Sequence, residues 1–124
     1  MTTTINWKEK AAALKFDGRA FVNGVRVDSV DKDTFDCISP LDGAVLTQVA
    51  RCKQADVDAA VVIARAAFED GRWAHTSPKH RKETLIRFAD LIVKNAHELA
   101  LTETMDMGKP LAFSLAPAVP AAQN

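Results

Sequence analysis

Cysteine is scarce in this sequence, and its placement excludes the sites that cysteine commonly builds. The chain has 124 residues and only two cysteines, Cys37 and Cys52, which are too few for a disulfide framework at this length. We therefore expect a protein of the reducing cytoplasm. Neither cysteine pairs closely with one of the three histidines, so the ligand spacing of a zinc site is missing.

Net charge and long hydrophobic runs are missing as well. The 16 lysines and arginines balance the 16 aspartates and glutamates, which argues against a general nucleic-acid binder because such binding needs a concentrated basic face. The apolar runs are a few residues long, whereas a membrane helix needs roughly 20 residues, and the N-terminus lacks the apolar core of a signal peptide. We expect neither nucleic acid nor a membrane as a partner.

The common motifs for phosphate binding and hydrolysis do not occur either. The sequence lacks G-x-G-x-x-G, G-x-x-x-x-G-K-[ST] and G-x-S-x-G, and its five glycines stand where turns or helix ends are expected. Cys37 falls within a strand pattern, where a buried structural thiol is commoner than a nucleophile. The residues alone therefore indicate no catalytic constellation.

The first half of the chain predicts one helix and two hairpins. Apolar residues at helical spacing predict a short amphipathic helix over residues 5–15. The pair Asn23-Gly24 separates two β-favouring runs and predicts a hairpin over residues 20–27, because both residues tolerate the positive φ of a tight turn. The runs 34–38 and 44–50 predict a second hairpin.

The second half predicts two main helices. Asp56 is the expected N-cap of the first, which carries apolar residues at three- and four-residue steps and ends before Gly71. The pair Ser77-Pro78 opens the second and longest helix, with serine as N-cap and proline at the first helical position. We expect that helix to run without a break to Gly108.

The last stretch, residues 111–124, has a different composition. It contains no charged residue and two prolines, so its helix signals are weak. We expect a poorly ordered tail here unless another chain covers it.

Two groups of charged residues leave alternatives open. Basic residues at 79–82 stand in the first turns of the long helix, where the helix dipole disfavours them, which indicates either a phosphate or carboxylate partner or a plain solvent face. Glu103 and Asp106 stand near the C-terminus of that helix, where negative charge needs compensation. A bound cation, a salt bridge to Lys109 and solvent exposure remain alternatives.

Several short motifs in one order resemble the start of an aldehyde dehydrogenase. The resemblance covers roughly residues 5 to 115, and the motifs lie at residues 21–24 (Phe-Val-Asn-Gly), 34–46, 56–68, 73–81 and 99–110. It implies an α/β fold, namely the N-terminal part of a cofactor-binding domain with a short helix, two β-hairpins and two main helices. The implied division is 1–115 as part of that domain and 116–124 as a divergent, disordered tail.

The resemblance implies the oxidation of an aldehyde to an acid with NAD or NADP as cofactor. The nearest likeness is to the branch that acts on γ-glutamyl-γ-aminobutyraldehyde in putrescine catabolism. The family's nucleophilic cysteine, general-base glutamate, oxyanion-hole asparagine and glycine-rich cofactor loop correspond to positions beyond Asn124. We therefore assign no catalytic or cofactor-binding residue, and expect this chain to be inactive alone.

One family site transfers by residue. Some members bind Na⁺ or K⁺ through strand carbonyls and an acid, and the matching positions are Cys37, Ile38 and Asp106, with a further ligand expected downstream. These are the hard oxygen donors that such a cation prefers.

The sequence departs from the family pattern after Leu115. The family continues there with a charged helix, whereas residues 116–124 contain no charged residue. This pattern indicates a truncated gene, a frameshift or an incomplete gene model. The missing C-terminal part or a full-length homologue is then the expected partner. The alternative function is that of a small interaction protein that docks on a full-length homologue.

Overall fold

The computed structural model describes residues 5–118 and has a mixed helix and strand fold. Two antiparallel strand pairs lie between helices, and no third strand joins either pair in this part of the chain. The elements are α1 (Trp7–Ala13), β1 (Ala20–Val22), β2 (Val25–Val27), β3 (Thr34–Ile38), β4 (Val45–Ala50), α2 (Gln54–Glu69), α3 (Pro78–Lys94), α4 (Ala96–Met107) and α5 (Leu111–Ala118).

The two predicted hairpins are confirmed. Strands β1 and β2 pair around Asn23 and Gly24, whose φ angles of 52° and 82° are those that a tight primed turn requires. Strands β3 and β4 pair over the predicted ranges, with an irregularity in register between Cys37 and Ile38. A bulge of this kind changes the direction in which the next side chain points.

The start of α2 differs from the prediction. The helix begins at Gln54 with Lys53 as N-cap, so Asp56 lies inside the first turn. From there its carboxylate still caps the helix, because it accepts a hydrogen bond from the backbone N–H of Lys53 at 2.8 Å. It also accepts a hydrogen bond from the backbone N–H of Val30, outside the helix, at 2.7 Å. The end of α2 is as expected, since Gly71 has a left-handed φ of 73°.

The prediction of one unbroken helix from Ser77 to Gly108 is wrong. The N-cap at Ser77 is confirmed, but the helix breaks at Asn95, whose φ of −103° and ψ of 13° are not helical. The Asn95 side chain donates to the carbonyl of Leu91 at 2.7 Å, which is the local competition that makes asparagine a poor helix residue. The break turns α4 away from α3. The sequence prediction missed it because the apolar spacing of a helix continues on both sides of Asn95.

The expectation of a poorly ordered stretch from Leu111 is wrong for residues 111–118, which form α5. Gly108 ends α4 with a left-handed φ of 74° and reverses the chain, which lets α5 pack on α4. Ser114 is buried in this contact and lies 3.4 Å from the hydroxyl of Thr104. The remaining predicted tail, residues 119–124, lies outside the described residues.

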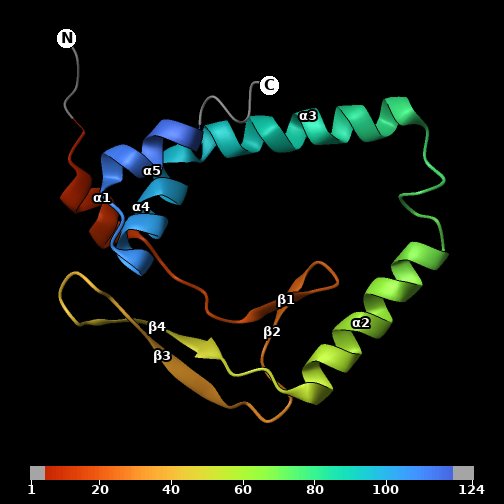
Figure 1. Ribbon diagram of the computed structural model, residues 1–124, viewed down its shortest axis with the longest axis horizontal. Helices are drawn as coiled ribbons and strands as arrows, with labels where there is room; N and C mark the ends of the chain where they lie inside the picture. The colour runs from red at the N-terminus through yellow and green to blue at the C-terminus, as the bar shows by residue number, and fades with distance from the viewer. Residues whose placement is uncertain (1–4, 119–124) are drawn as a thin grey trace.

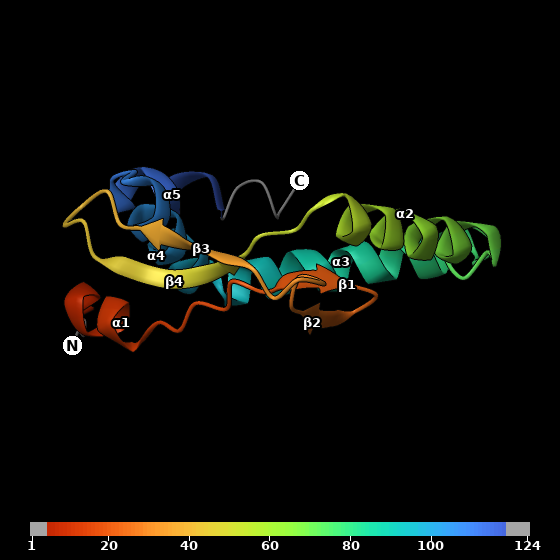
Figure 2. The same cartoon turned by 90° about the horizontal axis from the view of Figure 1, so that it is seen from below.

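The elements follow one another around a flat ring rather than stacking into layers (Figures 1 and 2). Helices α1, α4 and α5 gather at one side of the ring with β3 and β4 (Figure 1). Here lie the buried apolar residues of the described chain, Ala96, Ala100 and Leu101, and an edge contact between Trp7 and His97 at 5.0 Å joins α1 to α4. The core is therefore small and sits at one end.

Helix α2 lies on the opposite side of the ring, and α3 runs from that side back to α4 (Figure 1). Neither contains a buried residue, although both carry large apolar side chains. Within residues 5–118, no helix has both the length and the apolar character that crossing a membrane requires.

Candidate functional site

Two of the three residues of the candidate cation site, Cys37 and Asp106, line a hollow between the segment after α1, the β3–β4 hairpin and α4, whereas Ile38 does not. The volume of the hollow is about 320 Å³, and Phe16, Cys37, Thr47, Thr102 and Asp106 are among the residues that line it. The hydroxyl of Thr47 donates to the backbone carbonyl of Phe16 at 3.3 Å and holds the segment against β4. Sequence-distant elements thus meet at this hollow.

The structure brings Cys37 and Asp106 together. The Cys37 thiol donates to a carboxylate oxygen of Asp106 at 3.1 Å. The hydrogen bond to Asp106 raises the pKa of this thiol, and partial burial and the nearby negative charge raise it further. A raised pKa makes a thiol a poorer nucleophile. Cys37 is only partly buried, not fully buried as the strand pattern led us to expect.

Ile38, the third residue expected at the cation site, follows Cys37 at the irregularity in β3. Its side chain is a hydrocarbon without a donor atom, so only its backbone carbonyl is suited to bind an ion. A carboxylate at a helix end and strand carbonyls are a chemically suitable but incomplete set for an alkali cation. No cluster of three or more histidine, cysteine or acidic side chains able to hold a metal occurs within residues 5–118. The cation site remains a prediction.

The second acid of this region, Glu103, has a different partner. Lys109 donates to its carboxylate at 3.0 Å, and both side chains are partly buried. This ion pair is the main reason why the pKa of Glu103 is lowered, and a hydrogen bond from Ser114 adds to it. Of the three alternatives for the charges at this helix end, the salt bridge therefore applies to Glu103.

Two of the basic residues 79–82 have partners within the chain. Lys79 lies 4.0 Å from Glu83 on the same helix face. Arg81 donates to the backbone carbonyls of Ala74, at 3.3 Å, and Thr76, so it holds the loop before α3. A structural role thus accounts for Arg81.

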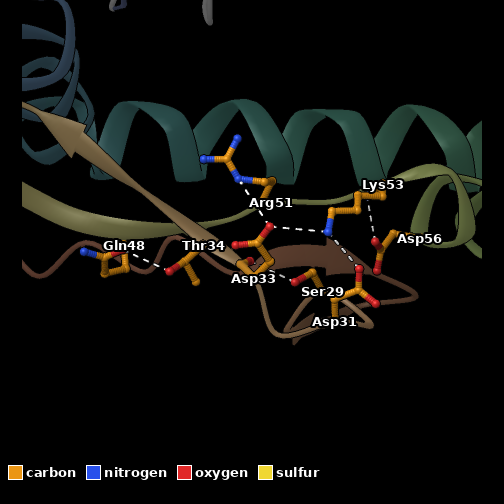
Figure 3. Close-up of polar contacts among 8 residues, drawn as sticks. All are labelled: Ser29, Asp31, Asp33, Thr34, Gln48, Arg51, Lys53 and Asp56. Atoms are coloured by element: carbon orange, nitrogen blue, oxygen red, sulfur yellow. Dashed lines mark hydrogen bonds and ion pairs between the residues drawn. The ribbon is translucent and has the colours of Figure 1, made fainter.

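Sequence reasoning missed a polar cluster at the start of α2 (Figure 3). The Lys53 ammonium lies 2.9 Å from Asp31 and 3.4 Å from Asp33, and Arg51 reaches Asp33 at 3.5 Å. Hydrogen bonding to Asp31 is the main cause that raises the pKa of Lys53. The available signal was the alternation of two acids before β3 with two bases after β4, because antiparallel pairing places such residues side by side.

Asp56 extends this cluster to the backbone (Figure 3). Its two backbone hydrogen bonds lower the pKa of its carboxyl, and they tie the N-terminus of α2 to the turn at Val30. We call the side chains of Asp31, Asp33, Arg51, Lys53 and Asp56 the α2 anchor. Each exposed ion pair contributes little to the free energy of folding by itself. The structural role of the anchor is therefore to orient α2.

The described residues contain no glycine-rich phosphate loop. A phosphate loop needs successive glycines before a helix, whereas Gly24, Gly43, Gly71 and Gly108 each take a left-handed φ at separate turns or helix ends. We therefore assign no cofactor contact to this part of the chain.

Comparison with known proteins identifies the family in which these elements occur. The aldehyde dehydrogenase family model matches residues 27–124. The NADP/NAD-dependent aldehyde dehydrogenase PuuC of Escherichia coli is 41% identical over 116 residues, which are 94% of this chain and 23% of the relative. Aminoacetaldehyde dehydrogenase of Pseudomonas aeruginosa is 45% identical over 82% of this chain and 20% of its own length.

Solved structures agree with this result. The γ-glutamyl-γ-aminobutyraldehyde dehydrogenase of Burkholderia cenocepacia matches 95% of this chain and 24% of its own, with 48% identity and a TM-score of 0.90. The indole-3-acetaldehyde dehydrogenase AldA of P. syringae, in complex with NAD⁺, matches the same shares with 49% identity and a TM-score of 0.90. This chain thus spans about a quarter of the length of these proteins, and it belongs to the aldehyde dehydrogenase family.

Proposed function

We propose that this chain is the N-terminal part of the cofactor-binding domain of an NAD(P)-dependent aldehyde dehydrogenase whose substrate is γ-glutamyl-γ-aminobutyraldehyde, in putrescine catabolism. Such an enzyme oxidises the aldehyde to an acid, and the nicotinamide accepts the hydride. The observation that supports this substrate is the similarity, at 48% identity and a TM-score of 0.90, to an enzyme named for that aldehyde. The indole-3-acetaldehyde dehydrogenase AldA is as similar, so the assay below is designed to separate the two substrates. The 41% identity to PuuC, named as an NADP/NAD-dependent aldehyde dehydrogenase, supports the nicotinamide cofactor.

In this proposal the described residues have a structural role, and residues elsewhere in the enzyme form the active site. The hydrogen bond that raises the pKa of Cys37 opposes a nucleophilic role for it, and no glycine-rich loop is present to hold a pyrophosphate. Asp106 and the carbonyls of Cys37 and Ile38 would hold Na⁺ or K⁺ and supply a fixed positive charge at the hollow. We expect the 124-residue chain alone to oxidise no aldehyde.

Sequencing the genomic DNA beyond codon 124 in all three frames, followed by expression of any continuous enzyme, tests the proposal. The readout is NAD(P)⁺ reduction with γ-glutamyl-γ-aminobutyraldehyde, aminoacetaldehyde and indole-3-acetaldehyde, because the similar enzymes are named for these three compounds. We expect the highest kcat/KM for the first. A higher value for either competitor would overturn the substrate, and the absence of any continuation would overturn the enzyme role.

The exposed apolar faces of α2 and α3 favour a second candidate function, the binding of another polypeptide. A complete homologue is a poor partner for such binding. It already contains its own copy of these helices, as the 95% coverage in matching enzyme structures indicates.

A further inference from the structure

The turn of the β1–β2 hairpin contains a residue pair with a chemistry of its own. We propose that Asn23 is a modification site, which loses its side-chain amide spontaneously through a succinimide formed with Gly24 when the hairpin opens. This reaction lies outside the oxidation of aldehydes, and it does not depend on which aldehyde the enzyme oxidises.

The reaction needs an asparagine whose side chain the next backbone nitrogen can reach. The backbone nitrogen of Gly24 loses its proton and attacks Cγ of Asn23, and the bond from Cγ to the amide nitrogen breaks. Ammonia leaves with that proton, and a five-membered succinimide ring remains. Water then adds to either ring carbonyl, which gives aspartate or isoaspartate at residue 23. Glycine favours the attack because it has no Cβ to obstruct it.

Asn23 differs from the other asparagines in the part of the chain that the structure describes. Asn6 accepts a hydrogen bond from the backbone of α1 at 3.3 Å, and Asn95 donates one to a carbonyl of α3 at 2.7 Å. Tryptophan and alanine follow these two residues, so a Cβ stands beside the attacking nitrogen. Asn23 is exposed and its side chain has no hydrogen-bond partner within residues 5–118. Nothing lies within 4 Å of the Cβ position of Gly24, so the turn is open to water.

Aspartates before glycine can close the same ring, and the chain has three of them: Asp17, Asp42 and Asp70. Hydrogen bonds lower the pKa of each carboxyl, from arginine side chains at Asp17 and Asp70, and from a serine hydroxyl and a backbone N–H at Asp42. These three groups therefore stay ionised near neutral pH. An ionised carboxylate is a poor electrophile, so the amide of Asn23 is the more reactive group.

The closed turn protects Asn23, but the hairpin is easily opened. Ring closure needs the Asn23 Cβ and the Gly24 nitrogen to eclipse each other about the Cα–C bond, which is not the torsion of a left-handed residue such as Asn23, with its φ of 52°. Strands β1 and β2 have three residues each, and no third strand joins them within residues 5–118. Because an isolated two-stranded hairpin is marginally stable in water, the open and reactive form is populated.

A cross-strand pair helps to hold this hairpin closed. Phe21 and Arg26 are partners in the register, and the guanidinium of Arg26 lies 5.5 Å from the centre of the Phe21 ring. The same guanidinium donates to the carbonyl of Arg19 at 3.2 Å. Such pairs stabilise a two-stranded sheet. Loss of the Phe21 ring is therefore expected to open the hairpin and speed the reaction.

The products change both the charge and the backbone of the turn. Asn23 lines an apolar groove of about 480 Å³ between the hairpin and α2, together with Asp28 and Asp56. Aspartate at residue 23 adds a further negative charge to this groove near neutral pH. Isoaspartate instead adds a methylene to the main chain, which a two-residue turn does not accommodate in the same register. We expect modified chains to lose the β1–β2 pairing.

The test is to incubate the full 124-residue chain near neutral pH and to follow each asparagine by peptide mapping and mass spectrometry. We expect Asn23 to be converted at least about tenfold faster than Asn6 and Asn95, because neither of those has both a free side chain and a following glycine. We expect both aspartate and isoaspartate, which chromatography separates. A rate at Asn23 no higher than that at Asn95 would overturn the proposal.

Gly24→Ala tests the succinimide. Its Cβ obstructs the attacking nitrogen, so we expect the reaction at Asn23 to slow by about tenfold. The φ of 82° at this position disfavours alanine in the closed turn, and opening of the turn alone would speed the reaction. A slower reaction is therefore not explained by a change in folding, and an equal or faster reaction would overturn the succinimide route.

Phe21→Ala tests the open hairpin. We expect it to raise the rate at Asn23 severalfold, up to the rate in a free peptide of residues 20–27. Phe35→Ala is the matched control, because Phe35 also has an arginine guanidinium over its ring, at 5.2 Å, but lies in the other hairpin. We expect this control to leave the rate unchanged. An unchanged rate in Phe21→Ala, an equal increase in Phe35→Ala, or a parent rate equal to that of the peptide would overturn the role of hairpin opening.

Discussion

Replacing Gly18 with alanine is expected to disturb the approach of the N-terminal segment to β4. A Cβ at this position would lie 2.1 Å from the carbonyl oxygen of Gln48 and 2.8 Å from the Cα of Val49. Both are backbone atoms, so neither can move away by a side-chain rotation. The carbonyl of Gly18 also accepts a hydrogen bond from the backbone N–H of Ala50 at 2.8 Å. Moving the N-terminal segment away from β4 to make room for the Cβ would stretch this hydrogen bond.

The expected loss of stability follows from these two effects. Overpacking costs about 1–3 kcal/mol, and a backbone hydrogen bond contributes about 1 kcal/mol, so we expect Gly18→Ala to lower the free energy of unfolding by about 3 kcal/mol. Gly24→Ala is the matched control, because nothing lies within 4 Å of its Cβ position but its φ of 82° is left-handed. We expect that substitution to cost only about 1 kcal/mol.

Urea unfolding followed by far-UV circular dichroism measures both changes, and hydrogen exchange at the Ala50 amide adds a local readout. We expect the Ala50 amide to lose protection in Gly18→Ala and to keep it in Gly24→Ala. Equal stability of Gly18→Ala and the parent chain, with the Ala50 amide still protected, would refute the close backbone approach.

Three further outcomes are expected. Leu101→Ala removes a 4% exposed side chain and should cost about 2–5 kcal/mol in urea unfolding, whereas Leu99→Ala, on the exposed side of α4, should cost much less. The ion pair that lowers the pKa of Glu103 contributes stability above the ordinary glutamate range and loses it as pH falls through the lowered value, so Glu103→Gln should flatten the acid side of a stability–pH curve. The raised pKa of Cys37 predicts slow alkylation by iodoacetamide near neutral pH, and Asp106→Asn should accelerate it in a mass-spectrometric time course; an unchanged rate would contradict the thiol–carboxylate contact.

Local chemistry determined most of the elements from sequence. Asn23 and Gly24 specify a turn that few other residues tolerate, and Ser77 caps α3 through its own side chain, so both features need no distant contact. The pair of Cys37 and Asp106 was reached through the family resemblance, because 69 positions separate the two residues and no spacing rule joins them.

The failures came from a local signal that the apolar periodicity outweighed and from contacts between distant segments. A continuous apolar periodicity concealed the break at Asn95, and the neutral composition after Leu111 gave no sign that α5 would pack on α4. The α2 anchor was missed because strand pairing, and not sequence distance, places Lys53 beside Asp31.

The sequence by itself determined the hairpins, most helix ends and the family, since each depends on side chains acting on their own backbone or on several motifs in a fixed order. Only the tertiary structure decided the packing of α5 and which apolar faces, those of α2 and α3 among them, stay bare. Burial depends on which distant segments come into contact. An amphipathic helix has the same apolar pattern in its sequence whether or not a partner covers its apolar face.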